Sequence, residues 1–193
     1  MKIFFCVATA AAAMSAAPAW AALTATEQSA ILTAHNTERA NTGPSPGVAA
    51  LTWSTDLATY AQAWATSLAT ADKGLLHRNS SPNTADQTPN NTLPCCSGEY
   101  LGENLSGNTA TDDGTLGAAG VASWISEKAN YNYAQDDGLG AGCAAGNTCG
   151  HYTQVVWRAS TLVGCGKATS ASGWTFVVCN YYTAGNFSGQ KPY

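Results

Sequence analysis

The sequence predicts an α+β fold in which helices pack on an antiparallel sheet. Apolar residues recur at helical spacing in the N-terminal part, whereas runs with strand composition come mostly near the C-terminal end. A glycine-rich segment, residues 132–150, separates the two patterns. With 193 residues and no internal repeat, the chain has the size of a targeting peptide followed by one domain.

The first residues predict a secretory signal peptide. Lys2 precedes an apolar run, residues 3–17, and the sequence Ala19-Trp20-Ala21 has the small-x-small form of a cleavage site. The run is too short and too rich in alanine for a membrane anchor, and no later stretch approaches the ~20 apolar residues that cross a bilayer. We therefore expect a signal peptide over residues 1–21, a mature domain over 22–193, no transmembrane segment and an extracellular location.

A capping box opens the first predicted helix. Thr24 and Glu27 have the spacing at which each side chain bonds the backbone N–H of the other residue. The helix is expected to run to about Ala40, because Pro44 and Pro46 follow.

Two further helices follow from the apolar spacing. The second begins after Ser54 or Thr55 as the N-cap, and its apolar stripe extends over residues 57–68. The third covers about residues 115–131 and carries Glu127 on its inward side, one turn after a tryptophan.

The strands are predicted from β-branched and aromatic runs. A polar stretch, residues 79–94, is rich in proline and asparagine and indicates a surface loop. Strands are expected at residues 155–157, 163–166 and 175–179, and the last two are joined by a turn at residues 170–173.

The charge balance excludes nucleic acid as a partner. Charged residues make up 10% of the chain, and the formal net charge is −4 at pH 7. Phosphate binding needs a basic face, which this composition does not supply.

The cysteine count indicates disulfides. One of the seven cysteines, Cys6, lies in the signal peptide, and an even number remains in an exported domain. No Cys-x-x-Cys motif occurs, which argues against a zinc ribbon or a thioredoxin-like site. The six cysteines of the mature domain are Cys95, Cys96, Cys143, Cys149, Cys165 and Cys179.

Local spacing favours two of the possible pairings. Cys143–Cys149 brackets a loop of small residues, and Cys165–Cys179 lies on the two predicted strands that share a turn. The adjacent Cys95 and Cys96 would then have only each other, and their pairing stays open.

Six motifs together resemble a known family. Residues 150–157 (GHYTQVVW) and 176–187 (FVVCNYYTAGNF) look like the two signatures of the CAP superfamily, which comprises cysteine-rich secretory proteins, antigen 5 and pathogenesis-related protein 1. The plant and fungal pathogenesis-related 1 type is the most similar in style. The other matches are His35-Asn36-x-x-Arg39, Gly102-Glu103-Asn104-Leu105, Trp124-x-x-Glu127-x-x-x-Tyr131 and Gly185-Asn186-Phe187-x-Gly189-x-x-Pro192-Tyr193.

The resemblance implies an α-β-α sandwich: a central antiparallel sheet flanked by helices, held by disulfides, in a single CAP (SCP) domain. It also implies the pairs Cys143–Cys149 and Cys165–Cys179. Hydrogen bonds from the first helix to the sheet are expected from the His35 motif. Structural roles in the shared motifs fall to His35, Asn36, Arg39, Trp157 and Asn180.

The resemblance further implies a central cavity lined by His77, Glu103, Glu127 and His151. Two neutral imidazoles and two carboxylates suit a divalent metal, with Zn2+ the natural candidate. The alternative is that the four side chains hydrogen-bond around water without a metal. Because a protonated imidazole cannot bind a metal, binding is expected to weaken below about pH 6.5.

Three functions remain open. The first is a secreted, monomeric, non-enzymatic effector that binds a sterol or another small lipid through residues 132–147 or neighbouring helices, or binds a host or target-cell surface component. The second is a metal-assisted or Ser–His–Glu peptidase, although nothing in the sequence activates the serines near the motifs, Ser80, Ser97 and Ser106. No His-Glu-x-x-His or Gly-x-Ser-x-Gly motif supports it. The third is a structural or antimicrobial contact through the outer surface.

Overall fold

The computed structural model describes most of the mature domain and confirms the α+β class. The predicted signal peptide and nearly all of the predicted loop at residues 79–94 lie outside the described residues. The described ranges are residues 22–78, 93–96, 100–136 and 142–193.

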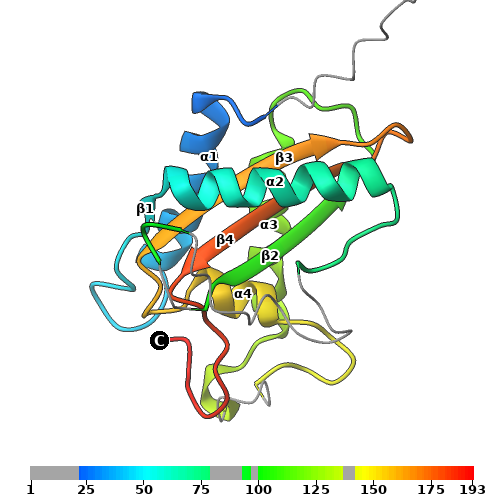
Figure 1. Cartoon of the computed structure of the whole chain (residues 1–193). Coiled ribbons are helices and arrows are strands. Elements are labelled where there is room, and N and C mark those ends of the chain that lie inside the picture. Colours follow the sequence, from blue (N-terminus) through cyan, green and yellow to red (C-terminus); the bar gives the residue numbers. More distant parts are fainter. Residues whose placement is uncertain (1–21, 79–92, 97–99, 137–141) are drawn as a thin grey trace, which may run out of the picture.

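A four-stranded sheet forms the central layer, with strand order β1-β3-β4-β2 (Figure 1). The strands β2 (Gly102–Asn108), β4 (Thr175–Tyr182) and β3 (Leu162–Thr169) are antiparallel, and of these β3 and β4 were predicted. At the other edge, the short β1 (Thr52–Trp53) pairs with β3 in parallel.

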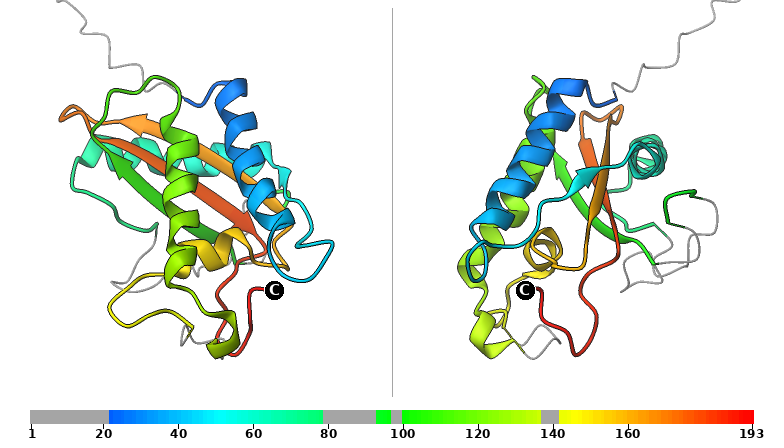
Figure 2. Two further views of the ribbon diagram at one scale, coloured as in Figure 1. Left: turned by 180° about the vertical axis from the view of Figure 1, so that it is seen from behind. Right: turned by 90° about the vertical axis from the view of Figure 1, so that its left-hand side faces the viewer.

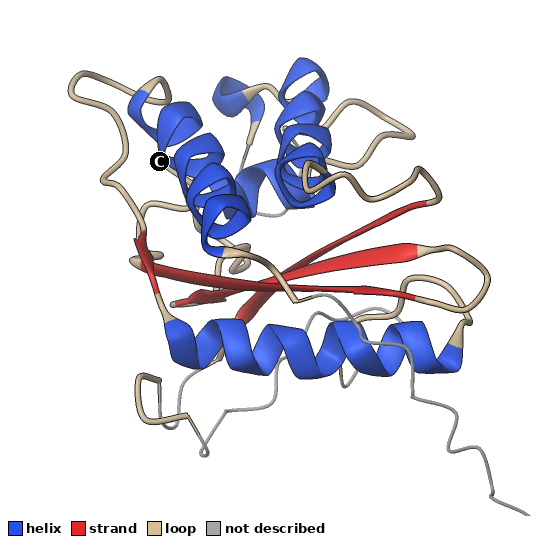
Figure 3. Ribbon diagram, turned by 90° about the horizontal axis from the view of Figure 1, so that it is seen from above, coloured by secondary structure: helices blue, strands red, loops and turns tan. Residues whose placement is uncertain are grey.

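Helices cover both faces of this sheet, which gives the expected α-β-α sandwich. Among the described helices, only the long α2 (Thr55–Ala71) crosses one face. The other face carries α1 (Ala25–Ala40), α3 (Leu116–Ser126) and the short α4 (Gly150–Val155), and the right-hand view of Figure 2 and Figure 3 show the three layers edge-on.

The helix starts follow the predicted caps. The Thr24 hydroxyl accepts the Glu27 backbone N–H, and the Glu27 carboxylate accepts the Thr24 N–H, so the capping box is complete. Ser54 caps α2 by accepting the N–H of Leu57.

Two glycines let α2 lie directly on β3. A Cβ at Gly164 would stand 2.2 Å from the Ala58 backbone nitrogen, and one at Gly166 would stand 2.3 Å from the Gln62 Cα. Any side chain at either position would push the helix off the strand. Trp64, predicted to lie in the buried stripe of α2, is only half-buried.

Alternation along β4 divides the core into two parts. Phe176 and Val178 pack with the alanines of α2. Val177, Cys179 and Tyr181 pack on the opposite face with residues of α1, α3 and α4. This period of two determines which side of the sheet each site residue of a strand can reach.

The prediction of a strand at residues 155–157 is wrong. Residues 150–155 form α4, and Val156 follows in a turn. Val155 and Val156 are fully buried, so the run is apolar because core surrounds it and not because it belongs to the sheet. A short apolar run cannot distinguish the two cases.

The sequence analysis missed β2. Its residues are mostly glycine, asparagine and glutamate, which have low strand propensity, and only Leu105 is apolar. The third helix is also shorter than predicted, because the chain passes from α3 into a 3-10 turn at Glu127–Asn130.

All three disulfides are present. Cys143–Cys149 ties the loop before α4 to the N-cap of that helix, and Cys165–Cys179 joins facing residues of β3 and β4. The pairing left open by the sequence is Cys95–Cys96, with Cys96 buried beside Leu57 and Leu101. Across the described residues, no helix has the length and apolar character needed to span a membrane.

Candidate functional site

The first pair of predicted site residues is His77 and Glu103. His77 follows α2, and its Nδ1 lies 2.8 Å from Oε1 of Glu103 on β2. The Glu103 side chain is fully buried, whereas a third of the His77 side chain is exposed. Glu103 Oε1 also accepts the backbone N–H of Arg78 at 3.0 Å, and Oε2 accepts from the Asn180 amide at 3.4 Å.

The second pair is His151 and Glu127. Glu127 stands at the end of α3, where the helix tightens, and its Oε1 lies 2.6 Å from His151 Nδ1. Its Oε2 accepts the backbone N–H groups of His151 and Tyr152, both at 3.1 Å. The His151 ring stacks on Trp124 with centroids 6.3 Å apart. Glu127 thus fixes both the ring of His151 and the start of α4.

Neighbouring residues of the edge strand β2 contact the two pairs, and their side chains point to opposite faces of the sheet. A Cβ at Gly102 would point at Gln154 of α4, so the next side chain, Glu103, points to the α2 face. Asn104 points back, and its amide donates to the carbonyl oxygen of His151 at 3.0 Å. The expected set of four therefore forms two His–Glu pairs, one that contains Glu103 of the edge strand and one that Asn104 of the same strand contacts through the His151 carbonyl.

No group of three or more His, Cys, Asp or Glu side chains close enough to hold a metal occurs within the described ranges. The chemistry of each pair nevertheless fits a metal ligand. A carboxylate at Nδ1 places the ring proton there, and Nε2 is then the basic nitrogen of the neutral ring. Histidines that bind metals usually donate their other N–H to a carboxylate in this way.

A buried polar atom beside the first pair has no partner. Asn180 is fully buried, and its amide nitrogen donates to Glu103 and to the Gly102 carbonyl. Its Oδ1 has no hydrogen-bond partner in the part of the chain that the structure describes. An unpartnered buried carbonyl costs about 1–3 kcal/mol, so it is a candidate acceptor for a bound group or a water.

The His35 motif connects α1 to the rest of the fold. His35 Nδ1 donates to the Ile31 carbonyl at 2.9 Å, and Nε2 accepts from the Tyr181 hydroxyl of β4 at 2.8 Å. Asn36 makes two bonds to the Leu51 backbone.

The guanidinium of Arg39 is wholly buried and bonds four carbonyl oxygens. These belong to Ala49, Val155, Trp157 and Ser160. Arg39 thereby joins α1 to the segment after α4.

Sequence reasoning missed Arg78. Its backbone holds Glu103, and its guanidinium lies 3.6 Å from the centre of the Tyr60 ring while donating to the Tyr60 carbonyl. Its position next to His77 was the available signal, because the neighbour of a candidate metal-binding side chain often helps to position that side chain.

A comparison with protein families gives a match to the cysteine-rich secretory protein family, CAP, over residues 32–181. The chain belongs to the CAP family. All four residues of the two His–Glu pairs lie within the matched range.

Plant relatives of this CAP protein are similar along most of its length. Pathogenesis-related leaf protein 4 of Solanum lycopersicum is 36% identical over 84% of this chain and 80% of its own length. Pathogenesis-related protein 1A of Nicotiana tabacum is 39% identical over 84% and 78%. The resemblance to the pathogenesis-related 1 type is thus confirmed.

Solved structures share the fold of this CAP domain. NaASP2 with Zn2+ has a TM-score of 0.63 at 22% identity, covering 89% of this chain and 86% of that one. Venom allergen-like protein 4 of Schistosoma mansoni has a TM-score of 0.57 at 22% identity, covering 88% and 95%.

Proposed function

We propose that this CAP protein is an extracellular, non-enzymatic binding protein whose His–Glu site takes a divalent metal. The observation that carries the proposal is the pairing itself: each histidine has a carboxylate at Nδ1, so Nε2 is the basic nitrogen. His77 and His151 would hold the metal, and Glu103 and Glu127 would orient the rings. A bound Zn2+ would supply positive charge to offset these two carboxylates. The similar protein NaASP2 has been solved with Zn2+.

Calorimetric titration with zinc chloride tests this site. We expect saturable binding at about pH 7.5 and much weaker binding at about pH 5.5, because a protonated imidazole cannot bind zinc. The double variant His77→Ala/His151→Ala should lose binding. The control Glu38→Gln removes a carboxylate outside the site and should bind as the native protein does. Equal affinity at both pH values, or undiminished binding by the double variant, would reject the metal site.

A small lipid, such as a sterol or a fatty acid, is the second proposed ligand. An apolar patch of Leu75, Leu76 and Trp174 supports it, because 44%, 52% and 38% of these residues, respectively, are exposed. Leu75 and Trp174 meet above Gly107, where a Cβ would stand 3.5 and 2.8 Å from their side chains. Large apolar side chains that gather at a surface often mark a binding site.

Equilibrium binding of a fluorescent sterol and a fluorescent fatty acid tests the patch. The variants Leu76→Ser and Trp174→Ser should weaken binding. Phe187→Ser, which removes another exposed aromatic ring away from the patch, should not. If neither probe binds saturably, the lipid proposal fails and the metal proposal still stands.

The peptidase alternative has less support. Ser80 and Ser97 lie outside the described residues, and the Ser106 hydroxyl faces Gly120 of α3. The described residues give no Ser–His–Glu chain. A proteolytic activity of the purified protein that disappears in Glu103→Gln would overturn the non-enzymatic proposal.

Membership of a family of secretory proteins supports the extracellular location. Native mass spectrometry of protein collected from the medium checks it together with the ligands. We expect the mass of residues 22–193, less two hydrogens for each of the three disulfides, with bound metal or lipid as added mass. A secreted chain that retains residues 1–21 would contradict the predicted cleavage.

A further inference from the structure

The disulfide Cys95–Cys96 closes the chain differently from the other two. Those enclose segments with sequence separations of 6 and 14, whereas Cys95 and Cys96 are neighbours, so their ring closes through one peptide bond. A disulfide stabilises a fold mainly by closing a loop in the unfolded chain, and this one has no residue between its cysteines. We therefore expect the domain to stay folded when Cys95–Cys96 is reduced.

Adjacent cysteines also form a disulfide that is easier to reduce. One peptide bond holds their Cα atoms 3.8 Å apart, whereas disulfides ordinarily join Cα atoms about 4.4–6.8 Å apart. Closure at the shorter distance strains the ring, and a strained disulfide is the more readily reduced one. This constraint comes from the adjacency of the two residues and does not depend on the rest of the fold.

Access distinguishes Cys95–Cys96 from Cys165–Cys179. Cys165 and Cys179 also lie close together, with Cα atoms 4.1 Å apart, but they are only 3% and 0% exposed within the core. Cys95 is partly exposed, although Cys96 is buried. A reductant can therefore reach Cys95 while the protein is folded.

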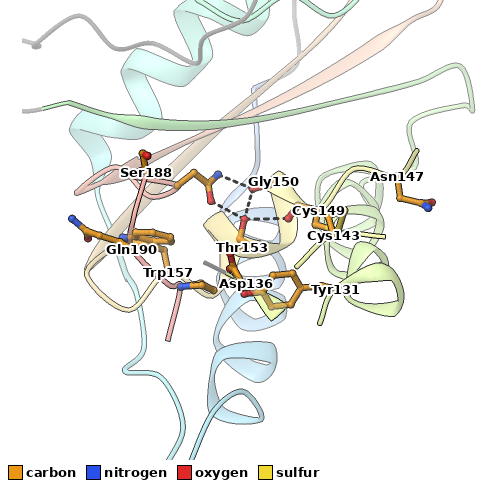
Figure 4. A pocket seen from close by; sticks show the side chains of 12 residues that line it. Tyr131, Asp136, Cys143, Asn147, Cys149, Gly150, Thr153, Trp157, Ser188 and Gln190 are labelled. Carbon is orange, nitrogen blue, oxygen red and sulfur yellow. Dashed lines mark hydrogen bonds between the residues drawn. A yellow bond between two sulfur atoms is a disulfide. The ribbon is translucent and has the colours of Figure 1, made fainter. Parts of the chain in front are cut away.

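Cys143–Cys149 has an ordinary geometry, with Cα atoms 5.7 Å apart. Figure 4 shows it at one wall of a pocket of about 360 Å³, beside α4, at whose N-cap Cys149 stands. Of the three disulfides that the structure describes, Cys95–Cys96 is thus the one that combines adjacent cysteines with an accessible sulfur.

Cys96 packs into a small apolar cluster between α2 and the start of β2. Its buried partners are Leu57 of α2 and Leu101, which directly precedes β2. Tyr60, nearly one turn after Leu57, packs against the same cluster. Because the cluster is close-packed, the arrangement of Cys96 affects the packing of both elements.

The same cluster adjoins the pair of His77 and Glu103. The Tyr60 ring lies 3.6 Å from the Arg78 guanidinium, and the Arg78 backbone N–H donates to Glu103 at 3.0 Å. Leu101 lies two residues before Glu103 in the chain. A change in the cluster would therefore reach the pair both through Tyr60 and along the backbone that enters β2.

We propose that Cys95–Cys96 is a redox site that a dithiol reduces in the folded protein, and that its reduction loosens the cluster beside Glu103. A thiolate of the dithiol attacks the Cys95 sulfur, the S–S bond breaks, and Cys96 takes up a proton as a thiol. The second thiolate then attacks the mixed disulfide, which releases Cys95 as a thiol and closes the disulfide of the reductant. Two electrons and two protons thus pass from the dithiol to the protein, and an oxidised dithiol reverses the exchange.

Reduction removes the bond that holds the two cysteine side chains in one arrangement. In the disulfide form, Cys96 lies against Leu57 and Leu101, and its backbone N–H donates to the Leu93 carbonyl at 3.1 Å. Two separate thiols adopt their rotamers independently, so Cys96 can leave this contact. The expected change at His77 does not require a bound metal.

Redox titration of the purified protein with mixtures of dithiothreitol and its oxidised form tests the exchange. Acid quenching, alkylation and peptide mass spectrometry then identify the reduced cysteines. We expect Cys95 and Cys96 to be alkylated together at a dithiol-to-disulfide ratio about tenfold or more below the ratio that Cys143–Cys149 requires, and reoxidation should restore the disulfide. The control Cys143→Ser/Cys149→Ser should keep this step. Reduction of Cys95–Cys96 only together with or after the other disulfides, or thiols that persist at Cys95 and Cys96 in oxidised dithiothreitol, would overturn the proposal.

Nuclear magnetic resonance of the histidine rings, at constant pH and without added metal, tests the effect on the pair. The His77 signal should shift when Cys95–Cys96 is reduced, whereas His35, bonded to Tyr181 on the other face of the sheet, should keep its signal. Cys95→Ser/Cys96→Ser should show the shifted His77 signal without reductant and should not respond to dithiothreitol. A His77 signal that stays unchanged on reduction, or that shifts no more than the His35 signal, would contradict the link between the disulfide and the pair.

Discussion

His35 shows how a single buried residue can make the stability of this domain depend on pH. It is fully buried, and its Nδ1 donates to a carbonyl that can only accept. Its Nε2 therefore accepts from Tyr181, and the ring is neutral in the folded protein. Burial, together with the charge of Arg39, lowers the pKa of His35 from 6.5 to about 4.

We predict that acid destabilises the fold through this residue. The unfolded chain binds a proton at His35 near pH 6.5, whereas the folded chain does so only near pH 4. Stability is therefore fully present above pH 6.5 and is lost as the pH falls through this window, by on the order of 3 kcal/mol in all. Urea unfolding of the native protein and of His35→Gln at about pH 7 and about pH 4.5 measures the difference.

His35→Gln retains a donor and an acceptor but does not titrate, so its stability should fall less between the two pH values. Comparing the loss of unfolding free energy between the two pH values in the native protein and in the variant cancels the contributions of the other titrating groups. Equal loss in both proteins would mean that His35 does not carry this pH dependence.

At the scale of elements, Lys167 ties the sheet to the helical layer. It lies on β3, only 3% of its side chain is exposed, and its Nζ contacts both Glu27 of α1 and Asp112 before α3. Burial opposes its charge, but the bonds to Asp112 and Glu27 raise the pKa of Lys167 above its usual value. The Glu27 carboxylate serves the capping box of α1 as well.

We predict that Lys167→Met costs about 3 kcal/mol, because it leaves two carboxylates close together without their cation. Lys128→Met is the matched control, since Lys128 is half-exposed and pairs with Glu38 at the surface. Its loss should stay below about 1 kcal/mol. Thermal or urea unfolding of both variants measures the costs, and a similar loss in both would contradict the structural role of Lys167.

The elements that were predictable are those whose signal is local. Thr24 with Glu27, and Ser54, mark the helix starts within a few residues of sequence, and the structure has both caps. The strand β2 carries no such signal, because most of its residues are polar or glycine. These residues form a strand because they pair with β4 in a sheet that helices cover on both faces. The apolar run at residues 155–157 was wrongly predicted as a strand. A fully buried segment has no polar side, so its sequence shows neither helical nor strand periodicity of hydrophobic residues.

The candidate site was predictable only in part for a related reason. The motifs identify Glu103, Glu127 and His151, but they do not show that alternation along β2 turns Glu103 away from α4. The side of the sheet follows from the register with β4, which no single motif contains.

At the scale of the whole molecule, two disulfides act on different properties. Cys165–Cys179 crosses two strands that the sheet already pairs, so its effect falls on the unfolded chain, where it closes a loop with a sequence separation of 14. Cys143–Cys149 closes a shorter loop, and it fastens that loop to the N-cap of α4, the helix that carries His151.

We therefore predict opposite profiles for the two double variants. Cys165→Ala/Cys179→Ala should lose about 3 kcal/mol of unfolding free energy and bind zinc with unchanged affinity, because the pairing of β3 with β4 keeps both strands in place. Cys143→Ser/Cys149→Ser should lose less stability, since the constrained loop is shorter, but should bind zinc more weakly because the start of α4, which carries His151, loosens. Urea unfolding and calorimetry on both variants separate the two effects. Parallel losses of stability and affinity in each variant would mean that Cys143–Cys149 affects zinc binding only through the stability of the fold.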